Sequence, residues 1–232
     1  MTRVNKAKEV ASYLKSAYPP TNSFLHYKKD WELLFAVILS AQATDKSVNE
    51  ATEHLFAQYP DLKDFTAANL EGILKCIRHV GLGKSKANYL IETSSILLNK
   101  FDGNVPKDRK LLRQLPGVGY KTSGVVLAEL YDYPFIPVDT HIFRVSHRIG
   151  LVNNKLTPEQ TEPELEKLFK GEHAIDRHHS LILFGRERCK SQVPNCEKCP
   201  FSSFCNYNKA SRKLKSKKNE IRTKEKKEKD KQ

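Results

Sequence analysis

The sequence predicts an all-α fold, because helical periodicity recurs along the chain and strand patterns are almost absent. Apolar residues between Val4 and Ala17 recur every three or four positions, as on one face of a helix, and Pro19-Pro20 ends this stretch. The one strand candidate, 135–138, contains a proline and is better interpreted as a linker.

The expected helices follow one another with short connections. Segment 31–41 is apolar on nearly all sides, which is typical of a helix buried in a core. Thr44-Asp45 has the composition of an N-cap for the next helix, which is expected to end near Tyr59-Pro60. The remaining expected helices lie at 70–78, 84–99, 108–114, 120–131, 140–149, 158–170 and 173–187.

The charge distribution suits a polyanionic partner without identifying one. The chain has 232 residues and a formal net charge of +13, and residues 209–232 alone carry 12 Lys/Arg and 4 Asp/Glu. Because Lys and Glu alternate there with almost no apolar residue, we expect 209–232 to be a basic disordered tail. The longest apolar run, Leu33 to Leu39, is too short to span a membrane, so no membrane partner is expected.

Two G-x-G turns, Gly81-Leu82-Gly83 and Gly117-Val118-Gly119, each lie between helical segments. In the second, Leu115-Pro116 ends one helix and the next begins near Tyr120. Glycines at 117 and 119 allow positive φ and leave backbone N–H groups bare, and a helix start of this kind can bind a phosphate. A tight turn between helices can require the same glycines, so a purely structural role stays open.

Lys121 and Asp139 are the candidate catalytic residues. Lys121 lies in the first turn of the second helix, where the helix dipole and partial burial would favour a neutral amine that can attack a sugar carbon to form a Schiff base. A plain phosphate contact is the alternative. Asp139 precedes segment 140–149 and is expected to be its N-cap. A carboxylate at this position could also offset positive charge on a sugar or act as a base.

Four cysteines lie close together near the C-terminus, which predicts a metal centre: Cys189, Cys196, Cys199 and Cys205. Zinc is the alternative to iron and sulphide, but zinc sites usually use two C-x₂-C pairs and only one close pair is present. The first residues contain no apolar stretch that resembles a signal peptide, so we expect metal in a reducing cytosol and not disulfides. Cys76 stands apart and is expected to be a buried apolar residue.

Three motifs together resemble endonuclease III: Leu115-Pro116-Gly117-Val118-Gly119-Tyr120-Lys121, then Val138-Asp139-Thr140-His141, then the spaced cysteines. Leu39 to Asp45 also resembles an early helix–turn of that family, and the match covers roughly residues 1–208. The resemblance implies two helical lobes with a helix-hairpin-helix motif and a C-terminal iron–sulphur cluster loop. We expect one lobe at 22–132, with the hairpin at about 108–127, and the cluster lobe at 1–21 plus 133–208.

The same resemblance implies a bifunctional DNA glycosylase and AP lyase of base excision repair. Such an enzyme removes oxidised pyrimidines and cleaves the abasic site by β-elimination through a lysine Schiff base. Lys121 would be the nucleophile and Asp139 the assisting carboxylate, and the four cysteines would hold a [4Fe-4S] cluster. Gln42 and Leu82 would fill the gap left by the extruded nucleotide. The other DNA-binding candidates are Gly117, Gly119 and His141.

The expected partner is double-stranded DNA with damaged bases or abasic sites, and we expect a cytoplasmic, nucleoid-associated monomer. Two departures from the family pattern affect the expected phosphate contacts: Tyr120 stands where relatives often carry a basic residue, and Ser123-Gly124 replaces a more usual Ala-Asn. An adenine glycosylase of the same superfamily would typically lack the lysine at 121, and a mismatch thymine glycosylase would tend to have tyrosine there. A catalytically silent DNA-binding module would not require both Lys121 and Asp139.

Overall fold

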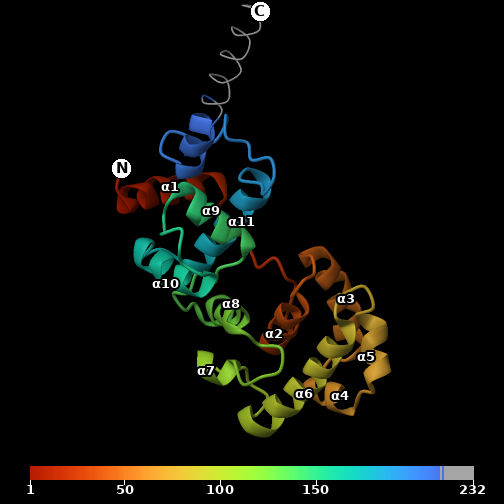
Figure 1. Cartoon of the computed structure of the whole chain (residues 1–232). Coiled ribbons are helices and arrows are strands. Elements are labelled where there is room, and N and C mark those ends of the chain that lie inside the picture. Colours follow the sequence, from red (N-terminus) through yellow and green to blue (C-terminus); the bar gives the residue numbers. More distant parts are fainter. Residues whose placement is uncertain (215, 217–232) are drawn as a thin grey trace, which may run out of the picture. The chain divides into compact units, whose positions relative to one another are not determined.

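A computed structural model describes residues 1–214 and 216, and within these residues all regular structure is helical, with no strand (Figure 1). The all-α prediction is therefore confirmed, and 135–138 is a connection as expected. The helices are α1 Arg3–Ala17, α2 Asp30–Leu39, α3 Asp45–Gln58, α4 Leu62–Ala67, α5 Leu70–Cys76, α6 Gly83–Phe101, α7 Arg109–Leu112, α8 Tyr120–Tyr131, α9 Thr140–Ile149, α10 Pro158–Leu168 and α11 Ala174–Glu187.

The chain divides into two compact units. The hairpin unit comprises Thr21–Pro137 and His173–Ile175, and the cysteine unit comprises Met1–Pro20, Val138–Glu172 and the described residues from Asp176 onwards. The lobe boundary expected after residue 132 lies a few residues too early. Tyr133 and Phe135 pack against the core of the hairpin unit, and Tyr133 donates a 2.8 Å hydrogen bond to the carbonyl of Lys107, which keeps the segment with that unit.

The core of the hairpin unit forms around α2, in which every residue from Trp31 to Leu39 is buried. Helices α3, α6 and α8 pack against α2, and the rings of Trp31, Phe35 and Phe65 meet edge to face at 5.0–5.6 Å. Phe65 belongs to α4, which the sequence did not predict. Six residues are too short for a helical period to show, although Leu62 and Phe65 are buried one turn apart.

The cysteine unit places α1 against α10 and joins three chain segments through a buried lysine. Lys6 is 7% exposed, and its ammonium donates to the carbonyl of Ile149 at 2.8 Å and to Oδ1 of Asn206 at 3.0 Å. Residues 206–214 are helical, so disorder does not begin at 209 as expected. Two side-chain hydrogen bonds hold the first turn of this helix: Asn206 accepts from Lys6, and Nδ2 of Asn208 donates to the carbonyl of Ser202 at 2.9 Å. Residues 215 and 217–232 of the expected tail lie outside the described part.

Several local predictions are confirmed at the ends of helices. Thr44 caps α3, since its Oγ1 accepts a 3.2 Å hydrogen bond from the amide of Ser47. The helices expected at 120–131 and 140–149 have those bounds. None of the described helices is long and apolar enough to cross a membrane.

Candidate active site

The turn between α7 and α8 uses its two glycines for different reasons. Gly117 has φ +76°, and a Cβ there would lie 2.7 Å from the ring of Tyr89 and 3.1 Å from Ile38, so only glycine fits. Gly119 has φ −87° and ψ −173°, so of the two glycines only Gly117 uses the positive φ that both allow. No atom lies within 4 Å of a Cβ built at Gly119, so this position is open to a group from outside the chain.

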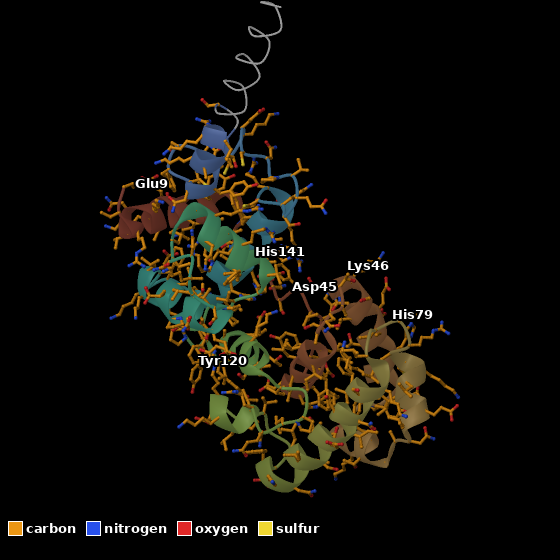
Figure 2. All side chains as sticks on the ribbon, in the orientation of Figure 1. Glu9, Asp45, Lys46, His79, Tyr120 and His141 are labelled. Atoms are coloured by element: carbon orange, nitrogen blue, oxygen red, sulfur yellow. The ribbon has the colours of Figure 1, made fainter. Side chains whose placement is uncertain are left out.

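Helix α8 begins without a side-chain cap. Gly119 is its N-cap residue and offers no side-chain acceptor, so the first amides of the helix have no partner within it (Figure 2, which labels Tyr120). Such a helix start attracts an anion such as a phosphate. Lys121 is the second residue of this turn and is exposed. The partial burial expected for Lys121 is therefore wrong.

Gln42 and Leu82 both have a left-handed backbone, with φ of +55° and +61°. Leu82 is the N-cap residue of α6 and is 59% exposed, so it does not belong to the core. Gln42 is exposed in the connection between α2 and α3. The two connections are neighbours, because a Cβ built on Gly81 would lie 3.6 Å from the carbonyl oxygen of Gln42.

Asp139 is the N-cap residue of α9. Its Oδ1 accepts a 2.7 Å hydrogen bond from the amide of Ile142, as the sequence predicted. The side chain is only partly buried, so a carboxylate oxygen remains available to a substrate while the cap is kept. The cap and a chemical role are therefore compatible.

His141 (labelled in Figure 2) lies one turn before Arg144, which connects α9 to the first cysteine of the metal-binding segment. The guanidinium of Arg144 donates to the carbonyl of Cys189 at 2.9 Å and to that of Gly185 at 2.9 Å, and Nη2 lies 3.1 Å from Nδ1 of His141. Because arginine only donates, this contact is a hydrogen bond when Nδ1 carries no proton. Burial lowers the pKa of His141, and Arg144 and Arg186 lower it further, against the raising effects of Asp139 and of a hydrogen bond with the backbone of Gly185.

All four clustered cysteines line one cavity in the cysteine unit, together with residues of the 194–208 segment and Arg148. Cys205 donates to the carbonyl of Arg148 at 3.0 Å, and Cys189 lies 3.7 Å from a guanidinium nitrogen of Arg148. Burial raises the pKa of Cys199, a hydrogen bond with the backbone of Phe201 lowers it, and the other three thiols raise it further.

This donor set fits a cluster. In the part of the chain that the structure describes, no three Cys, His, Asp or Glu side chains are close enough to share a single metal ion. A [4Fe-4S] cluster binds one thiolate at each iron, so four separate thiols around a common cavity suit it. Cys76 belongs to the other unit and is only partly buried. Its Sγ lies 3.2 Å from Oε1 of Gln58, so the expectation of a buried apolar residue is wrong.

Comparison with known proteins gives the family. A family described as HhH-GPD superfamily base excision DNA repair protein matches residues 35–171. Endonuclease III of Rickettsia conorii is 45% identical over 204 residues, which cover 88% of this chain and 95% of that protein. The chain belongs to the endonuclease III family. Endonuclease III of Escherichia coli K12 is 42% identical over 206 residues, covering 88% of this chain and 97% of that protein.

A solved structure of a trapped endonuclease III–DNA covalent intermediate has the same fold, with a TM-score of 0.85 and 37% identity over 91% of this chain and 99% of that chain. Membership in the endonuclease III family identifies the chain as a base excision repair enzyme that combines DNA glycosylase and AP lyase activities. Endonuclease III enzymes generally contain an iron–sulphur cluster, in agreement with the four cysteines around one cavity.

The two departures from the endonuclease III pattern meet at Arg109. Its guanidinium lies 4.3 Å from the ring centre of Tyr120 and 3.9 Å from that of Phe135, and Nη2 occupies the space that a Cβ on Gly124 would need. Sequence reasoning missed Arg109 and also the buried Lys86 of α6. For Lys86 a signal exists, because it shares the apolar face of α6 with Leu90 and Leu97.

Proposed function

We propose that Lys121 is the nucleophile and Asp139 the assisting carboxylate of this endonuclease III enzyme. The observation that carries the proposal is the start of α8, where an uncapped helix end, an open glycine and an exposed lysine occur within three residues. The helix end holds a phosphate of the DNA backbone, and the amine beside it is directed to the attached sugar. Since the protein does not bury Lys121, the bound DNA itself excludes water from its amine.

In the first step Nζ of Lys121 attacks C1′ and the bond from C1′ to the base nitrogen breaks. The base leaves with the bonding electron pair and takes up a proton. Asp139 offsets the positive charge that develops on the sugar and accepts the proton that the attacking amine loses. After the sugar ring opens, Lys121 and C1′ form an imine.

In the second step the imine withdraws electrons from C2′, which loses a proton. The bond from C3′ to its phosphate oxygen then breaks, so the strand is cleaved by β-elimination. Water hydrolyses the imine and releases Lys121. No second copy of the chain is needed for these steps, so we infer that the enzyme acts as a monomer.

Gln42 and Leu82 enter the duplex and fill the space that the extruded nucleotide leaves. Their exposed side chains, on two neighbouring connections, support this role. His141 contacts the DNA from the first turn of α9. Gly117 and Gly119 allow the backbone of the turn to approach a phosphate.

Cys189, Cys196, Cys199 and Cys205 would hold a [4Fe-4S] cluster. When bound, the cluster supplies iron–thiolate bonds that cross-link the segment from 189 to 205. Arg144 and Arg148 already donate to carbonyls of this segment, so the chain itself prepares part of its shape.

The substrate class that we infer is oxidised pyrimidines in double-stranded DNA, on the basis of the family pattern around Lys121 and Asp139. Since DNA is the substrate, we infer that the enzyme works on the nucleoid in the cytoplasm.

Borohydride trapping tests the nucleophile. Wild-type protein and an abasic duplex should give a covalent adduct of reduced electrophoretic mobility, and Lys121→Ala should lose it while keeping DNA affinity. Lys110→Ala is the matched control, because Lys110 is an exposed lysine of the same hairpin and should not affect trapping. An undiminished adduct in Lys121→Ala would overturn the assignment.

A further inference from the structure

Lys86 is a buried lysine that connects the two loops of Gln42 and Leu82. It lies in the first turn of α6 and is 2% exposed. Its ammonium donates to the carbonyl of Leu39 at 2.9 Å and to that of Ala41 at 2.6 Å, the residue directly before Gln42. Its amide donates to the carbonyl of Leu82 at 3.1 Å, so one residue bonds to both loops.

The backbone of both loops is held in a conformation that it would not adopt by itself. Leucine and glutamine rarely take a positive φ, and such residues persist where surrounding contacts fix them. Around Gln42 those contacts are the turn from Ala43 to Ser40, at 3.1 Å, and the two hydrogen bonds of Lys86.

The ammonium also suits its position electrostatically. Leu39 is the last residue of α2, so the two acceptors lie at the negative end of that helix. Lys86 is 2% exposed, and this burial lowers its pKa because the charged form is kept out of water at a cost. A hydrophobic side chain would fill the space without that cost, so the donors themselves have a role.

We propose that Lys86 is a positioning residue that presents Gln42 and Leu82 to the duplex as one rigid wedge. The inference rests on the proposed role of Gln42 and Leu82 in filling the gap. Without the ammonium, the carbonyls of Leu39 and Ala41 lose their donor and the Gln42 loop moves independently of Leu82. Binding to DNA must then order the loop, so the free-energy cost of extrusion is offset less fully.

Lys86→Met is the test variant, because methionine is similar in length and apolar but donates no hydrogen bond. Lys6→Met is the matched control. Lys6 is also buried and also donates to a carbonyl at the end of a helix, Ile149 of α9, but it belongs to the other unit and contacts neither loop. A general effect of losing a buried lysine appears in both variants.

Two activities are measured on the same preparation, so that any loss of folded protein cancels in their ratio. One is excision of an oxidised pyrimidine from a fully paired duplex, and the other is strand cleavage at a preformed abasic site, with borohydride trapping to count active molecules. Lys86→Met should lower the ratio of paired excision to abasic cleavage by about tenfold, because a paired nucleotide is the more costly to extrude. Lys6→Met should leave the ratio unchanged, and Lys86→Arg, which keeps donors, should restore part of it.

A fluorescence measurement reports the wedge directly. A duplex with 2-aminopurine opposite a tetrahydrofuran abasic analogue should brighten when wild-type protein enters the stack. The increase should fall in Leu82→Ala, in Gln42→Ala and in Lys86→Met alike. Adding Lys86→Met to the Leu82→Ala, Gln42→Ala double variant should cause no further loss.

The outcomes separate the two ideas. If Lys86→Met has the ratio and the fluorescence of wild type, or loses both activities equally, the positioning role is overturned while the roles of Gln42 and Leu82 stand. If Leu82→Ala and Gln42→Ala themselves leave the ratio and the fluorescence unchanged, the proposed wedge is wrong and the role of Lys86 is overturned with it.

Discussion

The side chain of Asp139 both accepts the capping hydrogen bond and carries a negative charge. Asparagine keeps the hydrogen bond but not the charge, and alanine keeps neither, so Asp139→Asn and Asp139→Ala separate the structural role from the chemical one. Oδ1 of Asp139 accepts from the amide of Ile142 at 2.7 Å. Asparagine and aspartate are equally good N-caps, whereas loss of the cap to alanine costs about 1 kcal/mol. Removing the charge from the start of α9 costs roughly 0.3–1 kcal/mol in both variants.

The free energy of unfolding of Asp139→Asn should therefore lie within about 1 kcal/mol of the wild-type value. That of Asp139→Ala should be lower by about a further 1 kcal/mol. For a chain of this length, 1 kcal/mol corresponds to a melting-temperature difference of roughly 2–4 °C. Thermal unfolding measured side by side on the three proteins checks this order.

The rate of base excision should depend on the negative charge of Asp139 and not on its capping hydrogen bond. Both variants lack a carboxylate that accepts a proton, so single-turnover base excision should fall by about 10²–10⁴-fold in each. Trapping on a preformed abasic site should fall less, because an aldehyde carbon is already available there. Normal excision by Asp139→Asn would show that Asp139 serves only as a helix cap. If the excision rates instead followed the order of stability, destabilisation of α9 would explain the loss of activity.

Three further predictions concern the cysteines, the tail and His141. Cys199→Ser should lower iron content, folded yield and DNA affinity together, and stoichiometric zinc in wild-type protein would contradict the cluster assignment. Deleting 217–232 should weaken DNA binding and flatten its dependence on salt, because phosphates bound by the protein release counterions, while excision at saturating protein survives. An unchanged slope of affinity against salt concentration would refute a contact between this segment and DNA. Because the folded state depresses the pKa of His141, its contribution to stability is present above the ordinary histidine pKa of about 6.5 and is lost as the pH falls through the lower, folded value. Denaturant unfolding at several pH values should show a smaller acid loss in His141→Asn, and equal loss in both proteins would refute the effect.

Much of the fold could be predicted because most helices are long and contact the core along a regular face. Segments 120–131 and 140–149 have the predicted bounds, since glycine or aspartate marks each start. Helix α4 could not be predicted in the same way. Its two buried residues, Leu62 and Phe65, are too few to define a period, and its stability comes from packing with α6.

The positions of the candidate catalytic residues at helix starts could be predicted from the sequence, but the long-range contacts and backbone conformations of the neighbouring residues could not. Lys121 and Asp139 lie at helix starts because the turn and cap residues beside them are local signals. The place of Lys86 on the apolar face of α6 signals its burial, but its ammonium bonds to carbonyls 45 and 47 residues away, and no local pattern records a contact of that range. The left-handed backbone of Leu82 is equally hidden, since leucine is not a residue that favours it.

The two departures from the endonuclease III pattern, Tyr120 and Gly124, both lie against Arg109 in the hairpin. The ring of Tyr120 lies against the guanidinium of Arg109, and Gly124 leaves the space that this guanidinium fills. A larger residue at 124 would displace Arg109 from between Tyr120 and Phe135, and a basic residue at 120 would bring a second cation against it. Either reversal alone is therefore unfavourable.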